Sequence, residues 1–119
     1  MIRILLFCAL LVASQKVTYN RLAVEDFQAA VQQPSVALID VRTPEEFEEG
    51  HIPGAANIDY LNTENFRASF DCYDRETPIY VYCKLGGRSK KAAQILLDMG
   101  FKEVNDLKGG YMTWRWEYD

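Results

Sequence analysis

Two short apolar runs constrain the fold of this chain more than any other feature. The first covers residues 36–39 and ends at Asp40, and the second covers residues 78–82 and ends at Cys83. Unbroken apolar runs of this length are typical of strands that are buried on both faces of a parallel sheet. Parallel strands need crossover connections, which are usually helices. The runs therefore predict an α/β fold, in which helices cover both faces of a central, mostly parallel sheet.

The segments around these runs carry alternating helix and strand signals. Thr43 supplies a hydroxyl cap and Pro44 follows at the first helical position, so a short helix is expected as far as Gly50. Elsewhere, apolar spacing predicts the helices and short apolar stretches predict the strands. The other expected helices cover residues 24–32, 62–70 and 89–99, the other expected strands cover 17–22, 56–58 and 101–106, and an aromatic turn or helix follows Gly109 and Gly110. No repeat or linker interrupts this alternation, which predicts one domain over residues 17–119.

Composition and charge exclude several classes of protein. The chain has 119 residues, enough for one domain and too few for two. Its net charge of −4, from 17 acidic and 13 basic residues, argues against a nucleic-acid partner. The three cysteines are scattered and form no C-x-x-C pair, which indicates neither a disulfide scaffold nor a zinc site. Nothing in the composition indicates an obligate interface, so we expect a monomer.

The first residues form a separate segment. Arg3 precedes an apolar run over residues 4–12, and the small residues Ala13 and Ser14 follow. A positive start, an apolar centre of about 7–15 residues and a small-residue exit are typical of a secretory signal. The run is shorter than the roughly 20 residues of a membrane-spanning helix. We predict that residues 1–14 are a signal peptide and that the protein is exported, to the periplasm if it is bacterial. The alternative is a buried first strand or helix of the domain.

The chemistry is concentrated in residues 83–89, which read CKLGGRS. Cys83 follows a buried strand, two glycines occupy the loop, and a helix is expected to begin near Ser89. Ligands of open parallel sheets bind at the carboxyl ends of the strands, where this loop lies. Glycines allow backbone N–H groups to turn inward as an anion nest, and the following helix adds the positive end of its dipole.

A thiol in such a field is expected to be ionised and reactive. Lys84 and Arg88 add positive charges, and Lys90 and Lys91 extend the basic patch. Cations and helix N-termini favour the thiolate form. The predicted catalytic residue is therefore Cys83, and the predicted substrate-binding residues are Lys84, Leu85, Gly86, Gly87, Arg88 and Ser89. The alternative is an ordinary buried cysteine before a glycine turn.

This geometry suits covalent sulfur transfer. The thiolate would take the outer sulfur of a small anion such as thiosulfate and hold it as a persulfide within the N–H cradle. A thiophilic acceptor, such as cyanide or a thiol, would then remove that sulfur. Arg88 would orient the anionic donor through its fork of N–H groups.

Three blocks of the sequence resemble the rhodanese family of sulfurtransferases. Residues 83–89 match its active-site loop of cysteine, four residues, arginine and then serine or threonine. A second block runs from Asp40 to Ile58 and contains the letters DVRTPEEF and GHIPGA. The third is Gly109-Gly110-Tyr111 with Trp114. The resemblance implies a single domain of the rhodanese-like fold, a persulfide on Cys83, and no metal ion or organic cofactor.

The length of the loop separates two activities of this fold. Related phosphatases have one more residue between cysteine and arginine, so the resemblance favours sulfur transfer over a phosphatase or arsenate reductase. A second alternative is a sulfur-relay or binding module, which would exchange persulfide with a thiol-bearing protein partner and turn over small donors poorly. Lys84, Leu85 and Gly87 depart from the residues that are common in the family, which leaves the donor and the acceptor open.

Residues outside the loop have less specific interpretations. Asp40 and Arg42 are expected near the site, where they either brace the loop or, as we favour, form an ion pair and a cap at the next helix. His51, the only histidine, is expected to be structural. Cys72 either resolves a persulfide on Cys83 or, as we favour, is unpaired.

Two further groups of side chains are interpreted as structural. The acidic run is expected to form a solvated helix face and contains Glu45, Glu46, Glu48 and Glu49. The aromatic residues near the end of the chain are expected to pack the last element over the core and comprise Tyr111, Trp114 and Trp116.

Overall fold

The computed structural model describes residues 16–119, which form an α/β domain around one five-stranded sheet. Every strand pair is parallel, and the strand order is β1-β5-β4-β2-β3. The strands are β1 (Thr18–Leu22), β2 (Ala37–Asp40), β3 (Ala56–Asn57), β4 (Ile79–Tyr82) and β5 (Glu103–Leu107). The predicted fold class is therefore confirmed. The predicted signal peptide lies outside the described residues.

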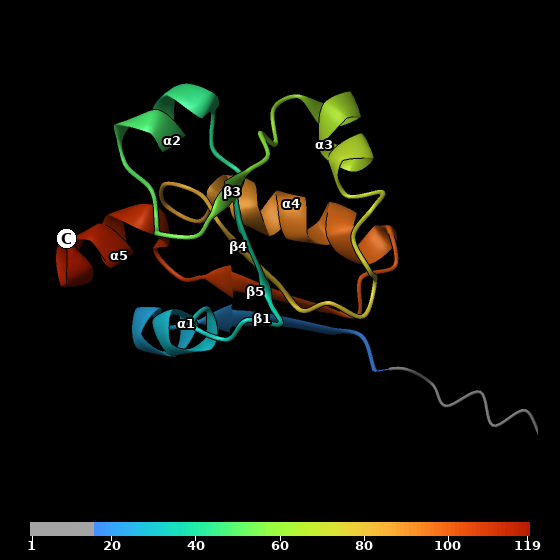
Figure 1. The fold of residues 1–119 in the computed structure, drawn as a ribbon, viewed down its shortest axis with the longest axis horizontal. Coiled ribbons are helices and arrows are strands. Elements are labelled where there is room, and N and C mark those ends of the chain that lie inside the picture. Colours follow the sequence, from blue (N-terminus) through green and yellow to red (C-terminus); the bar gives the residue numbers. More distant parts are fainter. Residues whose placement is uncertain (1–15) are drawn as a thin grey trace, which may run out of the picture.

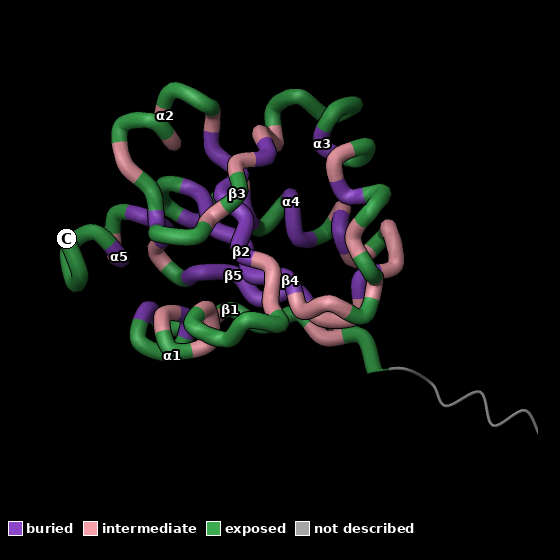
Figure 2. Tube along the Cα trace, in the orientation of Figure 1, coloured by how far each residue is buried: buried purple, intermediate pink, exposed green. Residues whose placement is uncertain are grey.

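Helices cover both faces of the sheet (Figure 1). They are α1 (Val24–Ala30), α2 (Pro44–Glu49), α3 (Thr63–Ser69), α4 (Gly87–Asp98) and α5 (Gly110–Tyr118). The apolar residues of α3 and α4 join one buried cluster, and those of α1 and α5 join another. Because side chains alternate along a strand, Ile79 and Val81 of β4 enter the first cluster while Tyr80 and Tyr82 enter the second. This explains the unbroken apolar runs, because side chains on both faces of β4 are buried. Figure 2 shows buried residues along the central strands.

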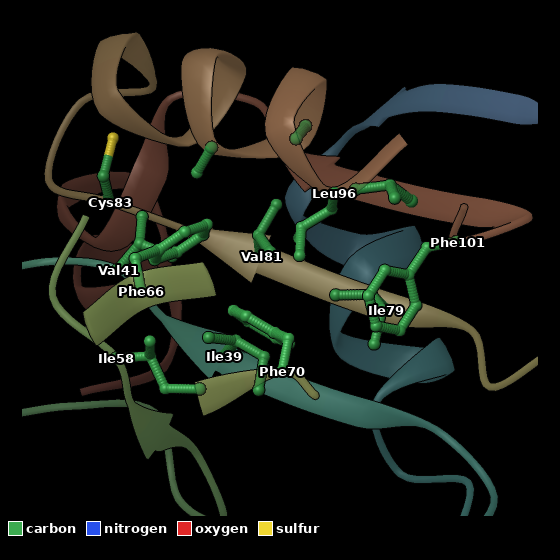
Figure 3. Close-up of a cluster of buried hydrophobic side chains, with 13 residues drawn as sticks. Ile39, Val41, Ile58, Phe66, Phe70, Ile79, Val81, Cys83, Leu96 and Phe101 are labelled. Carbon is green, nitrogen blue, oxygen red and sulfur yellow. The ribbon is translucent and has the colours of Figure 1, made fainter. Parts of the chain in front are cut away.

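The core beneath α3 and α4 is rich in phenylalanine (Figure 3). Phe70 lies at its centre and packs its ring against those of Phe66, Tyr73 and Phe101 at centroid distances of 5.1, 5.2 and 5.8 Å. Phe66, Phe70 and Phe101 are fully buried. These contacts fasten α3 and the start of β5 to the face of the sheet that also carries Cys83.

Helix α2 contributes no buried residue to either cluster, and local signals define its start. Thr43 accepts a hydrogen bond from the N–H of Glu46, whose carboxylate in turn accepts one from the N–H of Thr43. Pro44 occupies the first turn and Gly50 follows the last residue. The cap, the proline and the end at Gly50 agree with the sequence expectation.

The elements begin and end within about two residues of their expected bounds, and α4 and β5 show two of the differences. Helix α4 begins at Gly87 and not near Ser89, and β5 covers residues 103–107 and not 101–106. Gly86 adopts a φ of 109°, which a glycine reaches without strain, so the chain turns into the helix earlier than the polar residues suggested. Among residues 16–119, no helix is long and apolar enough to cross a membrane.

Candidate active site

The carboxyl ends of the central strands bring the second and first sequence blocks together. In the register of β2 with β4, Asp40 pairs with Tyr82, so Arg42 and Cys83 leave the sheet at the same edge. Ile58 also returns to this edge, where its N–H donates to Asp40 O at 2.9 Å. The site is thus assembled where a parallel sheet is expected to bind its ligand.

The Cys83 side chain lies at the boundary between the core and the loop. Its residue is 1% exposed and belongs to the phenylalanine-rich cluster, while its sulfur points out of that cluster toward the start of α4 (Figure 3). The N–H of Gly86 donates to Cys83 Sγ at 3.0 Å, and Sγ is 3.4 Å from Ser89 Oγ. The sulfur therefore has one backbone donor and one hydroxyl in contact with it. The bond donated by the Gly86 N–H is of the kind that stabilises negative charge on sulfur, whereas in the contact with Ser89 the thiol is the donor.

Helix α5 holds the loop from the other side. The N–H groups of Tyr111 and Met112 donate to the carbonyl oxygens of Cys83 and Lys84 at 2.8 and 3.2 Å. A side chain at Gly110 would place its Cβ 2.6 Å from Cys83 O, and Gly110 also has a φ of 66°. The glycine pair of the third sequence block is therefore explained by the close approach of two backbones.

Arg88 forms an ion pair with a residue of α2. Its two terminal nitrogens donate to the two carboxylate oxygens of Glu46 at 2.6 and 2.9 Å. The bonds from Arg88 lower the pKa of Glu46 to about 2, and the same pair raises the pKa of Arg88. The expected solvated acidic face is therefore wrong for Glu46, although Glu45, Glu48 and Glu49 are exposed. A guanidinium has five N–H groups, so Arg88 retains donors beyond the two in this pair.

Asp40 and Arg42 form a second, buried pair. Arg42 donates to both carboxylate oxygens of Asp40, the shortest contact being 2.7 Å, and also to Gly50 O at 2.7 Å. Burial alone would lower the pKa of Arg42, but the bonds with Asp40 outweigh it and raise the pKa. The guanidinium carbon lies 4.2 Å from the ring centroid of Tyr111. The pair thus connects the end of β2 to α5, while Thr43 and not Asp40 caps α2.

A cavity of about 560 Å³ opens beside the loop. Its lining combines the basic side chains of Arg42, Lys84 and Arg115 with the acidic side chains of Glu46, Glu49 and Asp119. Cys83 itself does not line this cavity, but Lys84, its neighbour in the chain, does. Arg42 and Arg115 are paired with Asp40 and Asp119, so the exposed Lys84 is the cation that this cavity presents next to the thiol residue.

Three of the other predicted loop residues lie on the outside of the site, and Ser89 does not. Lys84 and Gly87 are exposed, and Leu85 is 68% exposed at the loop. Ser89 is fully buried beneath the loop. The structure thus places Gly86 and Ser89 in contact with the sulfur, pairs Arg88 with Glu46, and leaves Lys84, Leu85 and Gly87 exposed.

The residues that were interpreted as structural differ in their contacts and in how far they are buried. His51 is stacked on Phe47, with ring centroids 3.7 Å apart, and lines the cavity. Cys72 and Cys83 are free, and Cys72 is exposed in the connection that leads into β4. Trp114 packs into the core as expected, whereas Trp116 is 86% exposed and does not.

Three features around the site were not found by sequence reasoning. These are the Glu46–Arg88 pair, the stacking of Arg42 on Tyr111, and the buried carboxyl of Asp106 on β5, which accepts a hydrogen bond from Tyr19. A capping-box pattern at Thr43 is visible in the sequence, but it does not show that Glu46 reaches a residue 42 positions away. No pattern in the sequence indicated the other two.

A parallel sheet with a thiol held between a glycine loop and a helix N-terminus defines a class of protein that binds anions at the strand ends. Comparison with known families specifies that class further. A family model described as "Rhodanese-like domain" matches residues 23–117. This chain belongs to the rhodanese family.

Individual relatives agree with this assignment. The chain is 35% identical over 97 residues to the thiosulfate sulfurtransferase GlpE of Shewanella oneidensis, covering 82% of this chain and 93% of that protein. It is 37% identical over 105 residues to the adenylyltransferase and sulfurtransferase UBA4 of Meyerozyma guilliermondii, where 84% of this chain covers only 24% of the longer protein.

A solved structure confirms the fold. The rhodanese-related protein of Thermoplasma volcanium superposes with a TM-score of 0.72 at 26% identity, covering 84% of this chain and 94% of that chain. The expected rhodanese-like fold is therefore shown by both sequence and structure.

Proposed function

We propose that this protein is a sulfurtransferase that moves sulfane sulfur from a thiosulfate-like anion to a thiophilic acceptor through a persulfide on Cys83. The observation that most supports this function is the Gly86 N–H on Cys83 Sγ at 3.0 Å, directly before the first turn of α4. A backbone donor and a helix N-terminus stabilise the charge that develops on sulfur. Relatives named thiosulfate sulfurtransferase support the same reaction.

The reaction proceeds by two displacements. The Cys83 thiolate attacks the outer sulfur of thiosulfate, the bond between the two sulfur atoms of the donor breaks, and sulfite leaves with the bonding electron pair. The acceptor then attacks the outer persulfide sulfur, and the electron pair of that bond returns to Cys83 as thiolate. No oxidant or cofactor is needed, because each step exchanges one sulfur–sulfur bond or forms one bond to the acceptor.

Charged side chains around the loop would guide the donor. Lys84 is exposed and lines the adjacent cavity, so a donor there would meet its positive charge next to Cys83, although Glu46, Glu49 and Asp119 line the same cavity. Arg88 would use the donors that Glu46 leaves free, so that Glu46 fixes the direction of the guanidinium. Ser89 would support the sulfur from below.

A sulfur-relay function is the second candidate, and the exposed apolar rim of the loop favours it. Leu85 is 68% exposed beside the buried Cys83. A protein partner that packs on Leu85 would bring its own thiol to the loop that holds the sulfur. A relay would show slow steady-state turnover with thiosulfate, yet form a stable persulfide that a partner protein removes.

The direct test is transfer from thiosulfate to cyanide by the full chain, together with the intact mass after incubation with thiosulfate. We expect thiocyanate to form and the mass of one sulfur atom to be added at Cys83. Cys83→Ser should remove both signals and leave the fold unchanged, with Cys72→Ser as the matched control that retains both. Absence of thiocyanate and of the adduct from the folded wild-type protein would reject both sulfur-transfer candidates.

Export remains a separate proposal. Residues 1–14 carry the order of a secretory signal, and the family match begins after them at residue 23. The test is the N-terminal residue of the protein purified from its own cells. An N-terminus near residue 15 is expected, and retention of Met1 in the mature protein would contradict cleavage.

A further inference from the structure

The start of α4 carries positive charge that the fold does not neutralise. The loop and the first three turns of the helix, residues 83–97, contain no acidic residue, although the whole chain has a net charge of −4. The basic residues of this segment are Lys84, Arg88, Lys90 and Lys91. Arg88 is paired with Glu46, but the three lysines are exposed, and none of them forms an ion pair within residues 16–119.

The unopposed charge is centred on two of these lysines. Lys84 lines the cavity together with Glu49 and Asp119, which offset its charge. Lys90 and Lys91 are absent from that lining and project from the helix into solvent. A partner that approaches the first turns of α4 therefore meets positive charge before it meets any carboxylate of this segment.

An apolar side chain and a bare turn of backbone lie beside these lysines. Gly87 is exposed and shares a helix face with Lys90 and Lys91, which follow it by three and four residues. Leu85, which is 68% exposed, precedes the helix with only the cap residue Gly86 between them. We call the exposed face of Leu85, Gly87, Lys90 and Lys91 the α4 surface.

The fold gives no reason for a glycine at position 87. Its φ is not in the left-handed region, and a Cβ there would meet no atom within 4 Å. Glycine destabilises a helix relative to alanine, so the residue needs another explanation. Gly87 follows Gly86 and lies two residues before Ser89, and these two neighbours contact the sulfur of Cys83. A missing side chain at this point leaves room for another molecule to approach the loop closely.

These features suit a protein better than a small anion or a nucleic acid. Lys90 and Lys91 lie about 4–6 Å along the helix from Gly87, since an α-helix rises about 1.5 Å per residue, so an anion held at the sulfur does not extend across them. An exposed leucine offers nothing to a dianion, whereas an apolar contact surrounded by charges is typical of protein interfaces. The α4 surface has no aromatic ring on which a base could stack. Lysines without partners are complemented by carboxylates.

We infer that the α4 surface docks an acidic protein that carries the acceptor thiol beside an apolar side chain. Its thiolate, whose proton has passed to solvent, attacks the outer sulfur of the Cys83 persulfide. The bond from that sulfur to Cys83 Sγ breaks, its electron pair returns to Cys83 as thiolate, and the partner leaves as a persulfide. This inference rests on the proposed sulfur transfer and specifies the acceptor.

The first test measures sulfur transfer from the Cys83 persulfide to two synthetic peptides of equal length, in which one cysteine is flanked by glutamates or by lysines. Each rate is divided by the rate of the same protein with cyanide, which is too small to span the α4 surface. Lys90→Glu combined with Lys91→Glu should lower the relative rate with the glutamate peptide about tenfold and raise that with the lysine peptide, because opposite charges speed association. Comparing proteins with the same peptide cancels the intrinsic reactivity of each peptide.

The matched control is Lys16→Glu combined with Lys102→Glu. It makes the same change in net charge at the opposite edge of the sheet, before β1 and β5, and should leave both relative rates at the wild-type values. Relative rates that do not change in the α4 variant, or that change equally in the control, would overturn the inference. Loss of binding to a uridine oligonucleotide in the α4 variant, with no effect on either peptide, would assign the surface to a nucleic acid and refute it as well.

The second test concerns the apolar part of the α4 surface. Leu85→Ser should lower the relative rate with a glutamate peptide that carries a leucine beside its cysteine, whereas Val17→Ser, at an apolar side chain that is 56% exposed before β1, should not. Equal rates in the two variants would remove Leu85 from the docking surface and overturn the inference as stated. Transfer to cyanide without any of these peptide effects rejects the docking surface alone, whereas absence of both thiocyanate and the sulfur adduct rejects the proposed function.

Discussion

At the scale of single residues, glycines determine how closely the backbone approaches the thiol. Gly86 has a φ of 109°, and a Cβ at this position would collide with the guanidinium of Arg21, which donates to Gly86 O. Gly87, the next residue, has an ordinary φ, and a Cβ there would meet no atom within 4 Å. Two adjacent glycines in the same motif thus have different physical requirements.

We therefore predict opposite effects of the same substitution at these two positions. Gly86→Ala should destabilise the fold by about 1–3 kcal/mol and displace the N–H from Cys83 Sγ, because the left-handed conformation is strained for alanine. Gly87→Ala should be neutral or stabilise the protein by about 0.4–1 kcal/mol. Urea unfolding measures the stability of both variants, and thiosulfate turnover measures the effect on the site. Equal stability of the two proteins would refute the different backbone requirements of Gly86 and Gly87.

At the scale of elements, the pair of Glu46 and Arg88 joins α2 to α4. Helix α2 buries no residue of its own, so its attachment depends on its cap, this ion pair and the bond from Arg42 to Gly50. Both partners of the ion pair are about a quarter exposed, which limits its contribution to stability. The pair fixes the direction of the Arg88 guanidinium more than it stabilises the chain.

The ion pair predicts a specific dependence on pH. The pKa of Glu46 falls from 4.5 to about 2 on folding, so its contribution is fully present above pH 4.5 and is lost as the pH falls toward 2. Glu46→Gln should cost about 0.5–1 kcal/mol of unfolding free energy at neutral pH and nothing near pH 2. Denaturant unfolding at several pH values measures this difference. Glu45→Gln is the matched control on the exposed side of the same helix and should show no such dependence.

At the scale of the whole molecule, two separate cores hold the sheet between its helices. The site depends on both, because α4 packs on one face and α5 on the other, and each supplies one side of the loop around Cys83. A substitution that loosens either core far from the thiol is therefore expected to lower the free energy of unfolding. It should change the site only where the fold itself is lost.

Phe70 provides the sharpest test of the larger core. Its side chain is fully buried among three other aromatic rings, so Phe70→Ala should cost about 3–5 kcal/mol. Trp116→Ala removes a larger side chain that is 86% exposed and should change stability by less than about 0.5 kcal/mol. The denaturant midpoints of the two variants measure these changes. A similar loss of stability in Phe70→Ala and Trp116→Ala would show that the described core is wrong.

The sequence determined the class of fold, the order of elements and the loop around the thiol, because each depends on signals within a few residues. Unbroken apolar runs indicated strands buried on both faces, Thr43 and Pro44 indicated the start of α2, and the spacing from Cys83 to Arg88 indicated the family. Only the tertiary structure decided which polar side chains from distant parts of the sequence meet. Glu46 reaches Arg88 across 42 positions and Tyr19 reaches Asp106 across 87. These contacts depend on the order and register of parallel strands, which local patterns do not encode.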